Sequence, residues 1–415
     1  MHLLILGMNY APETTGIGPY TSGLAEYLVS QGHRVTVATT FPHYPQWHQD
    51  PGYARGRRFL YWEQRNGVAV HRGWVFIPRR RSTGQRVIYD SSLALSTLFG
   101  ALPVPSVELI LCISPPLQAA LTAALLRPLH RAPVILLLKD LVPDAATAVG
   151  MLQPGLALQL ARRLERYAYR LADGIIVIGE AFRANLLAKG VPPARVTCIP
   201  DWADTERIRP MLRDNTFRQQ QGVPAEHVLI LHAGNMGAKQ GLRCVIDTAT
   251  LLRDLPDVHF LLVGDGNERL ELETLVHSRR LTNVRFLPLQ PDDAVAEMLA
   301  AADLLLLSQR PTLTDAVVPS KLLTYLAAGR PVLAAAEAGS TAARLVQASG
   351  GGIVIPPDNP AALARVIEQW RRDASAGAEM GQRGRRYVTE QYGRCRILTQ
   401  YERYLVNMVP EKRRR

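Results

Sequence analysis

Short apolar runs alternate with amphipathic stretches along the first half of the chain. The runs are continuous and rich in Leu, Ile and Val, at 3–7, 34–39, 109–114, 134–138 and 174–178. Helical periodicity occupies intervening segments, at 19–31, 117–129 and 156–171. Continuous apolar strands separated by helices are typical of a parallel sheet covered on both faces. The first half therefore predicts a doubly wound α/β domain.

The same alternation begins again in the second half. Strands are expected at 227–232, 259–263, 284–287, 303–307 and 331–335, and helices at 241–253, 267–280, 291–301 and 320–328. Residues 200–224 are polar and rich in Pro, Asp and Gln, which favours a linker. We therefore predict an α/β protein of two Rossmann-like parallel-sheet domains, 1–200 and 225–392, joined by a linker at 201–224. We expect these domains to face each other across a cleft, with a C-terminal helix at about 393–410 packing back on the first.

Composition excludes several classes of protein. The chain has 415 residues, of which 47% are apolar and 20% charged, so it is neither a disordered chain, a collagen nor a long coiled coil. Its four cysteines are scattered without a Cys-x-x-Cys pair, which argues against a disulfide framework or a Cys-rich zinc site and favours a reducing cytosolic setting. Residues 1–7 are too short for a signal peptide, and no apolar run reaches the roughly 18 residues of a membrane span.

The net charge of +12 is unevenly distributed. Residues 1–200 carry 20 basic and 11 acidic side chains, residues 201–411 are close to neutral, and the tail 412–415 is entirely basic. Basic clusters lie at 55–58 and 79–86, and the second leads directly into the apolar stretch 87–102. This pattern indicates a helix in the interface of an anionic membrane, although an ordinary buried helix beside a solvated basic loop remains an alternative. Nucleic acid is not favoured as a partner, because the basic runs lack interleaved aromatic residues and a binding motif.

Candidate phosphate-binding loops occur in both halves. Gly16 and Gly18 lie at the start of the first predicted helix, where glycines let backbone amides approach an anion, although a purely structural loop would look the same. They lie too far from the first strand for a dinucleotide fingerprint. In the second half, strand ends lead into 233–241, into 263–266 and, before a helix, into Ser320 and Lys321. Ser320 is a good N-cap, and the free amides and Lys321 would attract an anion.

Five segments occur in the order typical of one enzyme family: the Gly16-Ile17-Gly18 loop, 199–204, the turns at 233–235 and 263–266, and 319–332. In these segments the chain resembles the retaining glycosyltransferases of family 4, which have the GT-B fold. The resemblance covers nearly the whole chain. Segments 9–18 and 43–47 are similar to a narrower branch that builds bacterial exopolysaccharide, colanic-acid-like and O-antigen units on a lipid carrier. The resemblance implies a cytoplasmic enzyme peripheral to the membrane, with a nucleotide sugar as co-substrate, UDP favoured over GDP, a lipid-linked or saccharide acceptor and no metal or other cofactor.

The resemblance also implies roles for individual residues. The first domain would bind the acceptor, through Glu13 and His43, and the second the nucleotide sugar. The expected donor diphosphate contacts are Gly16, Gly18, Asn235, Lys239, Ser320 and Lys321, and the expected nucleoside and sugar pocket contains Gly264, Asp265, Gly266 and Thr324. Three features depart from the family pattern. Asn235 replaces a usual Arg, Lys239 is one place nearer the preceding glycine, and Ala316 and Thr324 replace a pair of glutamates.

Asp140 is the candidate acid–base or acceptor-orienting group. It follows the predicted strand 134–138, and a carboxylate at the carboxyl end of such a strand faces the binding side of the sheet. A turn cap, or an ion pair with Lys139, is the structural alternative. His232, which ends a strand, is more typical of a structural histidine.

Three other functions compete with this interpretation. A nucleotide-sugar 2-epimerase shares the fold but needs several carboxylates and histidines around the sugar. A non-catalytic nucleotide-binding subunit of a transferase complex would explain the missing glutamates. A nicotinamide-dependent dehydrogenase is disfavoured because the dinucleotide fingerprint is absent.

Overall fold

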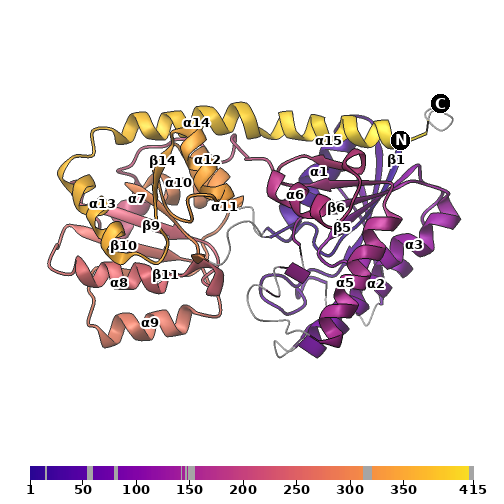
Figure 1. The fold of residues 1–415 in the computed structure, drawn as a ribbon, viewed down its shortest axis with the longest axis horizontal. Coiled ribbons are helices and arrows are strands. Elements are labelled where there is room, and N and C mark those ends of the chain that lie inside the picture. Colours follow the sequence, from indigo (N-terminus) through magenta and orange to yellow (C-terminus); the bar gives the residue numbers. More distant parts are fainter. Residues whose placement is uncertain are drawn as a thin grey trace. The chain divides into compact units, whose positions relative to one another are not determined.

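The computed structural model describes residues 1–14, 16–53, 59–78, 83–141, 143–144, 147, 155–311 and 320–410. These residues form two compact units. The first contains Met1–Asp201 together with the C-terminal segment that begins at Ile397, and the second contains Trp202–Arg396. Each unit is a Rossmann-like sheet with helices, which confirms the predicted fold class (Figure 1).

The described strands of the first unit form one sheet. Its strands are β1 (His2–Leu6), β2 (Arg34–Thr40), β3 (Leu60–Arg65), β4 (Val68–Gly73), β5 (Leu109–Ser114), β6 (Val134–Leu138), β7 (Gly174–Val177) and β8 (Val196–Cys198). Their order is β3-β4-β2-β1-β5-β6-β7-β8, and every neighbouring pair except β3–β4 is parallel. β1, β5 and β6 are buried along their whole length, which explains their continuous apolar sequences.

Strands β3 and β4 were not predicted. They pair antiparallel through a two-residue turn at Asn66 and Gly67, whose φ angles are +50° and +79°. Positive φ at both positions is the type I′ hairpin geometry that Asn-Gly favours. The Asn-Gly pair between two alternating segments was therefore a readable hairpin signal.

Helices of the first unit are α1 (Gly18–Ser30), α2 (Thr83–Ala101), α3 (Ala119–His130), α5 (Leu156–Leu171) and α6 (Glu180–Ala188), followed by a short 3₁₀ turn, η1 (Pro193–Arg195). The final helix, α15 (Arg394–Met408), contacts this unit from Ile397 onward. The Tyr27 hydroxyl of α1 donates a hydrogen bond to Glu402 at 3.2 Å, and the Tyr401 hydroxyl donates to the Ile199 carbonyl at 3.3 Å. These bonds hold the C-terminal helix against α1 and the end of β8.

The second unit has one parallel sheet with strands on both sides of β9. Its strands are β9 (Val228–Ala233), β10 (Val258–Val263), β11 (Val284–Leu287), β12 (Leu304–Ser308), β13 (Val332–Ala335) and β14 (Gly352–Ile355), in the order β11-β10-β9-β12-β13-β14. Its helical segments are α7 (Thr216–Gln220), η2 (Ala238–Gln240), α8 (Arg243–Leu251), α9 (Arg269–Ser278), α10 (Val295–Ala300), α11 (Ser320–Ala327), α12 (Thr341–Ser349), α13 (Pro360–Arg372) and α14 (Gly377–Tyr392).

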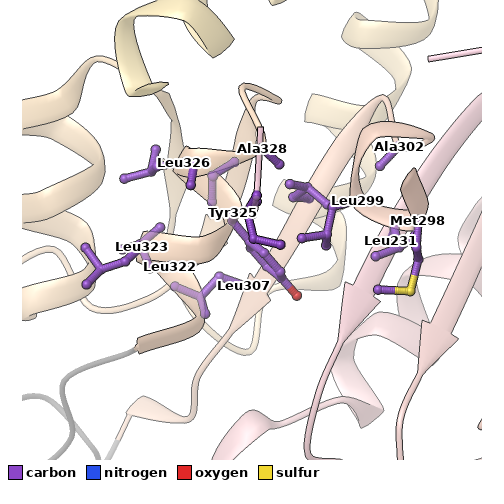
Figure 2. Packing of buried hydrophobic residues seen from close by; sticks show 14 of the residues in the cluster. Leu231, Met298, Leu299, Ala302, Leu307, Leu322, Leu323, Tyr325, Leu326 and Ala328 are labelled. Carbon is purple, nitrogen blue, oxygen red and sulfur yellow. The ribbon is translucent and has the colours of Figure 1, made fainter. Parts of the chain in front are cut away.

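One apolar cluster joins α11 to the sheet of the second unit. Leu322, Leu326 and Tyr325 of α11 belong to the same buried cluster as Leu231 of β9 and Leu307 of β12 (Figure 2). Burying a leucine side chain of this kind stabilises a fold by about 1.5–3 kcal/mol. The packing fixes the first turn of α11 beside the loop that follows β9.

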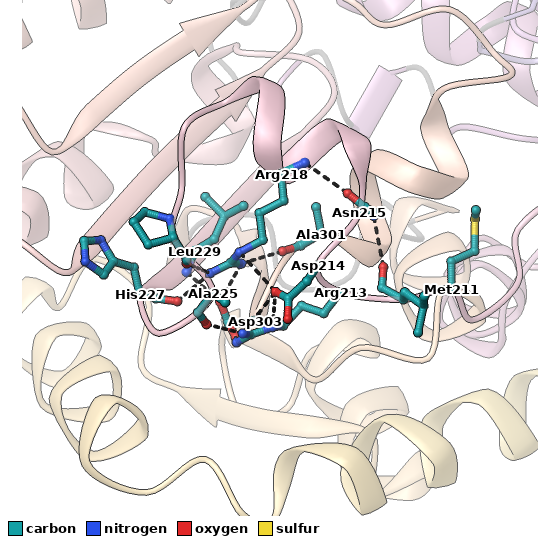
Figure 3. Close-up of polar contacts among 12 residues, drawn as sticks. Met211, Arg213, Asp214, Asn215, Arg218, Ala225, His227, Leu229, Ala301 and Asp303 are labelled. Carbon is teal, nitrogen blue, oxygen red and sulfur yellow. Dashed lines mark hydrogen bonds and ion pairs between the residues drawn. The ribbon is translucent and has the colours of Figure 1, made fainter.

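Residues 202–224, the segment expected to be a linker, lie within the second unit. Ile208, Phe217 and Val223 are part of its apolar core. The buried guanidinium of Arg218 donates to Asp303 Oδ2 at 3.0 Å, and Arg213 donates to Asp303 Oδ1 at 2.6 Å (Figure 3). The polar composition of this segment therefore reflects a buried ion-pair network in addition to solvent exposure.

Several sequence features lie outside the described residues: Arg55, Arg57 and Arg58, Arg79–Arg81, Ala316, and the tail 412–415. Helix α2, which follows the second basic cluster, is apolar on two faces. Tyr89 and Leu93 are buried, whereas Ile88 and Leu95 are exposed. No helix among the described residues combines the length and the apolar character needed to cross a bilayer.

Candidate active site

Loops after β9 and β10 form the centre of the candidate site in the second unit. The Gly234 amide donates to the Val263 carbonyl at 2.8 Å, and the Met236 amide donates to the Asp265 carbonyl at 2.8 Å. A Cβ atom on Gly264 would lie 2.0 Å from the Gly234 carbonyl oxygen, and one on Gly266 would lie 2.3 Å from the Met236 carbonyl oxygen. Gly264 and Gly266, in the turn after β10, are therefore required by the close contact of this turn with the backbone of the loop after β9.

This contact lies beside the point where the strand order reverses. β10 is on one side of β9 and β12 is on the other, so the chain leaves β9 and β12 in diverging directions. In open parallel sheets, ligands bind outside the carboxyl ends of strands at such a point. Gly234 and the residues after it thus occupy the position where a ligand of this unit is expected.

Lys321 places a buried cation at this point. The Nζ atom is inaccessible to solvent and has no hydrogen-bond partner among the described residues. A Cβ atom on Gly234 would lie only 3.1 Å from it. Burial lowers the pKa of Lys321 to about 8, because an ammonium ion is poorly solvated in such an environment. A bound anion would supply the missing charge and hydrogen bonds.

Two buried side chains hold this part of the sheet in place. Tyr325, one turn after Lys321, accepts from the Ala233 amide at 2.8 Å and donates to the Ala233 carbonyl at 3.1 Å. His232 lies in β9, and its Nδ1 is 3.2 Å from the Leu306 carbonyl oxygen. Burial, with the charge of Lys321 as a smaller cause, lowers the pKa of His232 to about 3. His232 is therefore neutral at physiological pH, as suits a structural histidine.

Further cationic and polar residues surround the same loops. Lys239 lies in η2 with its side chain half-buried, and its carbonyl accepts from the Arg310 amide at 3.1 Å. Arg310 lies two residues after β12, and its guanidinium is 3.3 Å from the Glu268 carboxylate. Asn235 is exposed. Arg310 was missed from the sequence, although its position two residues after a buried strand was the same signal that was used for Asp140.

Ser320, Asp265 and Thr324 have less specific surroundings. Ser320 is the first residue of α11 and is exposed. The Asp265 carboxylate accepts from the Gly266 amide at 2.8 Å, so it stabilises its own turn while remaining exposed. Thr324 is half-buried in α11. Ala316, the other position where a family glutamate is usual, lies outside the described residues.

In the first unit, Glu13 connects the loop after β1 to the loop after β2. Its buried carboxylate accepts three hydrogen bonds, from Asn9 Nδ2 at 2.7 Å, the His43 amide at 2.9 Å and the Tyr44 amide at 2.8 Å. His43 is also buried. Its Nδ1 is 2.9 Å from the Phe41 carbonyl oxygen and its Nε2 is 2.8 Å from the Tyr89 hydroxyl. Both side chains are thus fully engaged in shaping these loops.

Gly16 and Gly18 lie beside the same network. Gly16 has φ +66°, and a Cβ atom there would lie 3.2 Å from the Tyr44 ring. Gly18 begins α1, and a Cβ atom there would lie 2.7 Å from the Glu13 carbonyl oxygen. The two glycines permit the close fold of the loop. This loop follows β1, which adjoins β5 at the strand-order reversal of the first sheet.

Asp140 follows β6 and is half-buried. The ammonium of its neighbour Lys139 pairs with Asp201 and lies 4.7 Å from the centre of the Tyr20 ring. Lys139 is therefore engaged with Asp201 at the end of the first unit, and the role of Asp140 stays a prediction. Across the described residues, no three His, Cys, Asp or Glu side chains gather as a metal-binding group would require.

Sequence comparisons place both units in glycosyltransferase families. Residues 15–202 match the family described as glycosyl transferase 4-like domain, and residues 213–387 match glycosyl transferases group 1. The putative colanic acid biosynthesis glycosyl transferase WcaI of Escherichia coli (strain K12) is 33% identical over 377 residues, covering 89% of this chain and 92% of that protein. The probable glycosyltransferase WbjE of Pseudomonas aeruginosa is 28% identical over 237 residues, covering 57% and 59%.

Solved structures show the same fold at low sequence identity. Sucrose-phosphate synthase from Thermosynechococcus elongatus has a TM-score of 0.74 at 18% identity, over 98% of each chain. Anabaena Alr3699/HepE in complex with UDP has a TM-score of 0.71 at 18% identity, over 98% of this chain and 100% of that chain. Because a relative of one-third identity spans nearly all of both chains and both units match family models, the chain belongs to the family 4 type of glycosyltransferases with the GT-B fold, and it is a transferase enzyme.

Proposed function

We propose that this glycosyltransferase moves a sugar, with retention of configuration, from a nucleotide sugar to a lipid-linked or saccharide acceptor in bacterial surface polysaccharide synthesis. The observation that carries the proposal is the buried Nζ of Lys321, which has no partner among the described residues and lies beside Gly234. A buried cation without a counterion is costly, so the site is prepared for an anion. The donor diphosphate is the anion that this enzyme class must bind.

The positive charges of Lys321 and of the loops after β9 and β12 suit the chemistry of sugar transfer. As the bond between the sugar and the diphosphate breaks, negative charge grows on the leaving phosphate. Lys321, Lys239 and Arg310, with the free amides of the first turn of α11, would stabilise that charge. These groups can supply the stabilisation that a divalent cation supplies in other transferases, so we propose that no metal ion is needed.

The nucleotide and the product are proposed from relatives. Anabaena Alr3699/HepE was solved with UDP and with UDP-glucose, which supports UDP over GDP as the donor base. WcaI of Escherichia coli is named as a putative colanic acid biosynthesis glycosyl transferase, which supports a surface polysaccharide as the product. A lipid-linked acceptor would bring the enzyme to the inner face of the cytoplasmic membrane as a peripheral protein.

The acceptor is proposed to bind the first unit. Asp140 follows β6 at the carboxyl edge of the sheet and would orient or deprotonate the acceptor hydroxyl. Glu13 and His43 are buried, so we propose that they contribute through the loops they hold rather than by direct reaction. Retention then follows from attack on the same face as the departing phosphate, which would take up the hydroxyl proton if Asp140 only orients the hydroxyl.

The test measures donor binding and turnover in the full chain. UDP should raise the melting temperature more than GDP does, and purified enzyme should release UDP from a UDP-sugar in the presence of acceptor. Lys321→Met should reduce that turnover at least tenfold. Arg253→Ala, which removes an exposed cation two residues after the end of α8, should leave it unchanged. Unaltered turnover in Lys321→Met would remove the basis of the proposal. Complete loss of activity when metal ions are chelated would contradict the proposal that no metal ion is needed.

A further inference from the structure

Three neighbouring helices of the first unit present apolar side chains to solvent. Helix α2 packs against α3, and α3 packs against α5, so the three form one layer (Figure 1). We define the α2–α3–α5 face by the exposed apolar residues of these helices, which are Val87, Ile88, Leu95, Phe99, Leu121, Leu125, Leu129, Leu156, Leu160 and Tyr167. Scattered exposed leucines are ordinary on a soluble surface, whereas a contiguous set marks a binding surface.

The spacing of these residues follows the helices. Leu121, Leu125 and Leu129 lie four residues apart on α3, so they form one outward stripe. Leu156 and Leu160 form the start of a similar stripe on α5, and 78% of Leu156 is exposed. Each helix also has buried residues facing the sheet, such as Leu126 on α3. These helices are therefore apolar on the inner face, which packs against the sheet, and also on an outer face, which is exposed to solvent.

The second unit does not share this property. Of the large apolar side chains that are exposed among the described residues, only Met211, Leu212, Leu251, Leu270 and Leu289 belong to it, and they are spread over different elements. In the first unit, Phe59, Trp62 and Trp74 are also exposed outside these three helices, but most of the exposed large apolar side chains of this unit lie on the α2–α3–α5 face.

The exposed charges on the same helices have one sign. Arg163 and Arg170 lie seven residues apart on α5, on the side of the helix that carries Leu160 and Tyr167, and both are exposed. The acidic residues within the described parts of α2, α3 and α5 are Asp90 and Glu165. Both are buried and paired, Asp90 with Arg86 at 3.1 Å and Glu165 with Lys189 at 2.7 Å. The exposed surface of these helices therefore combines apolar and basic groups without a compensating carboxylate.

We infer that the α2–α3–α5 face rests on an anionic lipid surface, with its leucines in the interfacial region and Arg163 and Arg170 on headgroup phosphates. Apolar side chains gain free energy by leaving water, and arginines gain by approaching anionic headgroups. A second copy of this chain is less suitable, because two such faces would bring their arginines together. The inference rests on the proposed lipid-linked acceptor, and it locates the membrane contact on three helices instead of on a basic cluster alone.

The experiment measures vesicle binding by the full-length enzyme. Vesicles of phosphatidylcholine alone are compared with vesicles of equal parts phosphatidylcholine and phosphatidylglycerol, by flotation. The apolar variant carries Leu125→Glu and Leu160→Glu, and its matched control carries Leu251→Glu and Leu270→Glu on the second unit, where Leu270 is 76% exposed. The charge variant carries Arg163→Gln and Arg170→Gln, and its control carries Arg243→Gln and Arg372→Gln.

Wild type and both controls should float with the anionic vesicles. The apolar variant should lose at least tenfold in partitioning, and the charge variant should lose about thirtyfold on anionic vesicles, from two headgroup contacts. Equal binding of the apolar variant and its control would overturn the inference, as would no binding of wild type to anionic vesicles. A wild-type dimer in solution that dissociates in the apolar variant would overturn it in favour of a protein partner.

Two further measurements separate this inference from the proposed function. The melting temperature of each variant with and without UDP reports folding and donor binding. Release of UDP with a soluble saccharide acceptor reports transfer without a membrane. Loss of flotation in a variant that keeps its melting temperatures and its UDP release supports membrane binding by the α2–α3–α5 face. Absence of UDP binding in every protein, wild type included, contradicts the proposed function and leaves the flotation result standing.

Discussion

Gly264 lies directly against the carbonyl oxygen of Gly234, so closely that a Cβ atom on Gly264 would be 2.0 Å from that oxygen. Gly264 also has φ +136°, a conformation that side chains disfavour. The contact joins the turn after β10 to the loop that borders the Lys321 ammonium. Any residue other than glycine at position 264 must therefore displace the loop where the donor phosphate is proposed to bind.

Gly264→Ala should accordingly lower the free energy of unfolding by about 2–4 kcal/mol, through backbone strain and the clash with Gly234. Urea unfolding followed by circular dichroism measures this change. Gly339→Ala is the matched control, because a Cβ atom at Gly339 meets nothing within 4 Å. The control should change stability by less than about 0.5 kcal/mol. If the two variants were equally stable, the close contact would have no energetic consequence.

Lys321 predicts a pH dependence of stability in the absence of donor. Its folded-state pKa of about 8 is below the ordinary value of 10.5, because burial disfavours the charged form. Below pH 8 the ammonium is charged in both the folded and the unfolded chain, and its burial cost is fully present. Between about pH 8 and 10.5 the unfolded chain holds the proton that the folded chain has released, so this residue's contribution to stability rises with pH. The total gain is roughly 3 kcal/mol.

Comparison with Lys321→Met isolates this contribution. Urea unfolding at intervals from pH 7 to 10 should show wild type gaining stability relative to the variant as pH rises. With UDP present the trend should reverse, because the diphosphate favours the charged ammonium and binding weakens as the lysine loses its proton. A constant stability difference across the range would show that Lys321 does not titrate there.

Asp303 should be the most sensitive single position in the ion-pair network of Figure 3. Asp303→Ala leaves the guanidinium of Arg218 buried without its carboxylate and should cost about 3–5 kcal/mol. Asp257→Ala, which breaks the partly exposed pair with Arg371, is the control and should cost less than about 1 kcal/mol. Chemical denaturation measures both. A cost for Asp303→Ala as small as that of the control would refute a role for the network in holding residues 202–224.

Glu13 should affect both stability and acceptor use. Glu13→Ala leaves three buried donors unsatisfied, on Asn9, His43 and Tyr44, and should destabilise the first unit by about 3 kcal/mol. Because the loops after β1 and β2 would then move, we expect a higher KM for acceptor with little change in the KM for donor. Steady-state kinetics below the melting temperature measures both constants.

Glu26→Ala is the matched control for Glu13. The Glu26 carboxylate accepts from Asn66 at 2.9 Å at an exposed site, so its removal should cost less than about 1 kcal/mol and leave both constants unchanged. A raised donor KM in Glu13→Ala, with the acceptor KM unaltered, would place the role of this loop on the donor side instead.

Local sequence patterns were sufficient for most of the fold. The predicted strands 134–138 and 284–287 have the bounds found in the structure, and helix 156–171 likewise, because continuous apolar runs and helical periodicity are local signals. The β3–β4 hairpin was missed because β3 is polar and partly exposed and β4 is a short alternating strand, so neither has a continuous apolar run. The Asn66-Gly67 turn marked it.

Sequence alone determined that this chain has two α/β units of one type, a glycosyltransferase resemblance and glycine-rich turns at strand ends. Tertiary structure decided what the individual residues in those turns do. Glu13, a candidate acceptor contact, is enclosed by three donors, while Lys321 is a buried ammonium with no partner in the described part of the chain. Burial and hydrogen-bond partners depend on segments far apart in sequence, so a motif can identify a loop but cannot show which of its side chains remains available to bind a ligand.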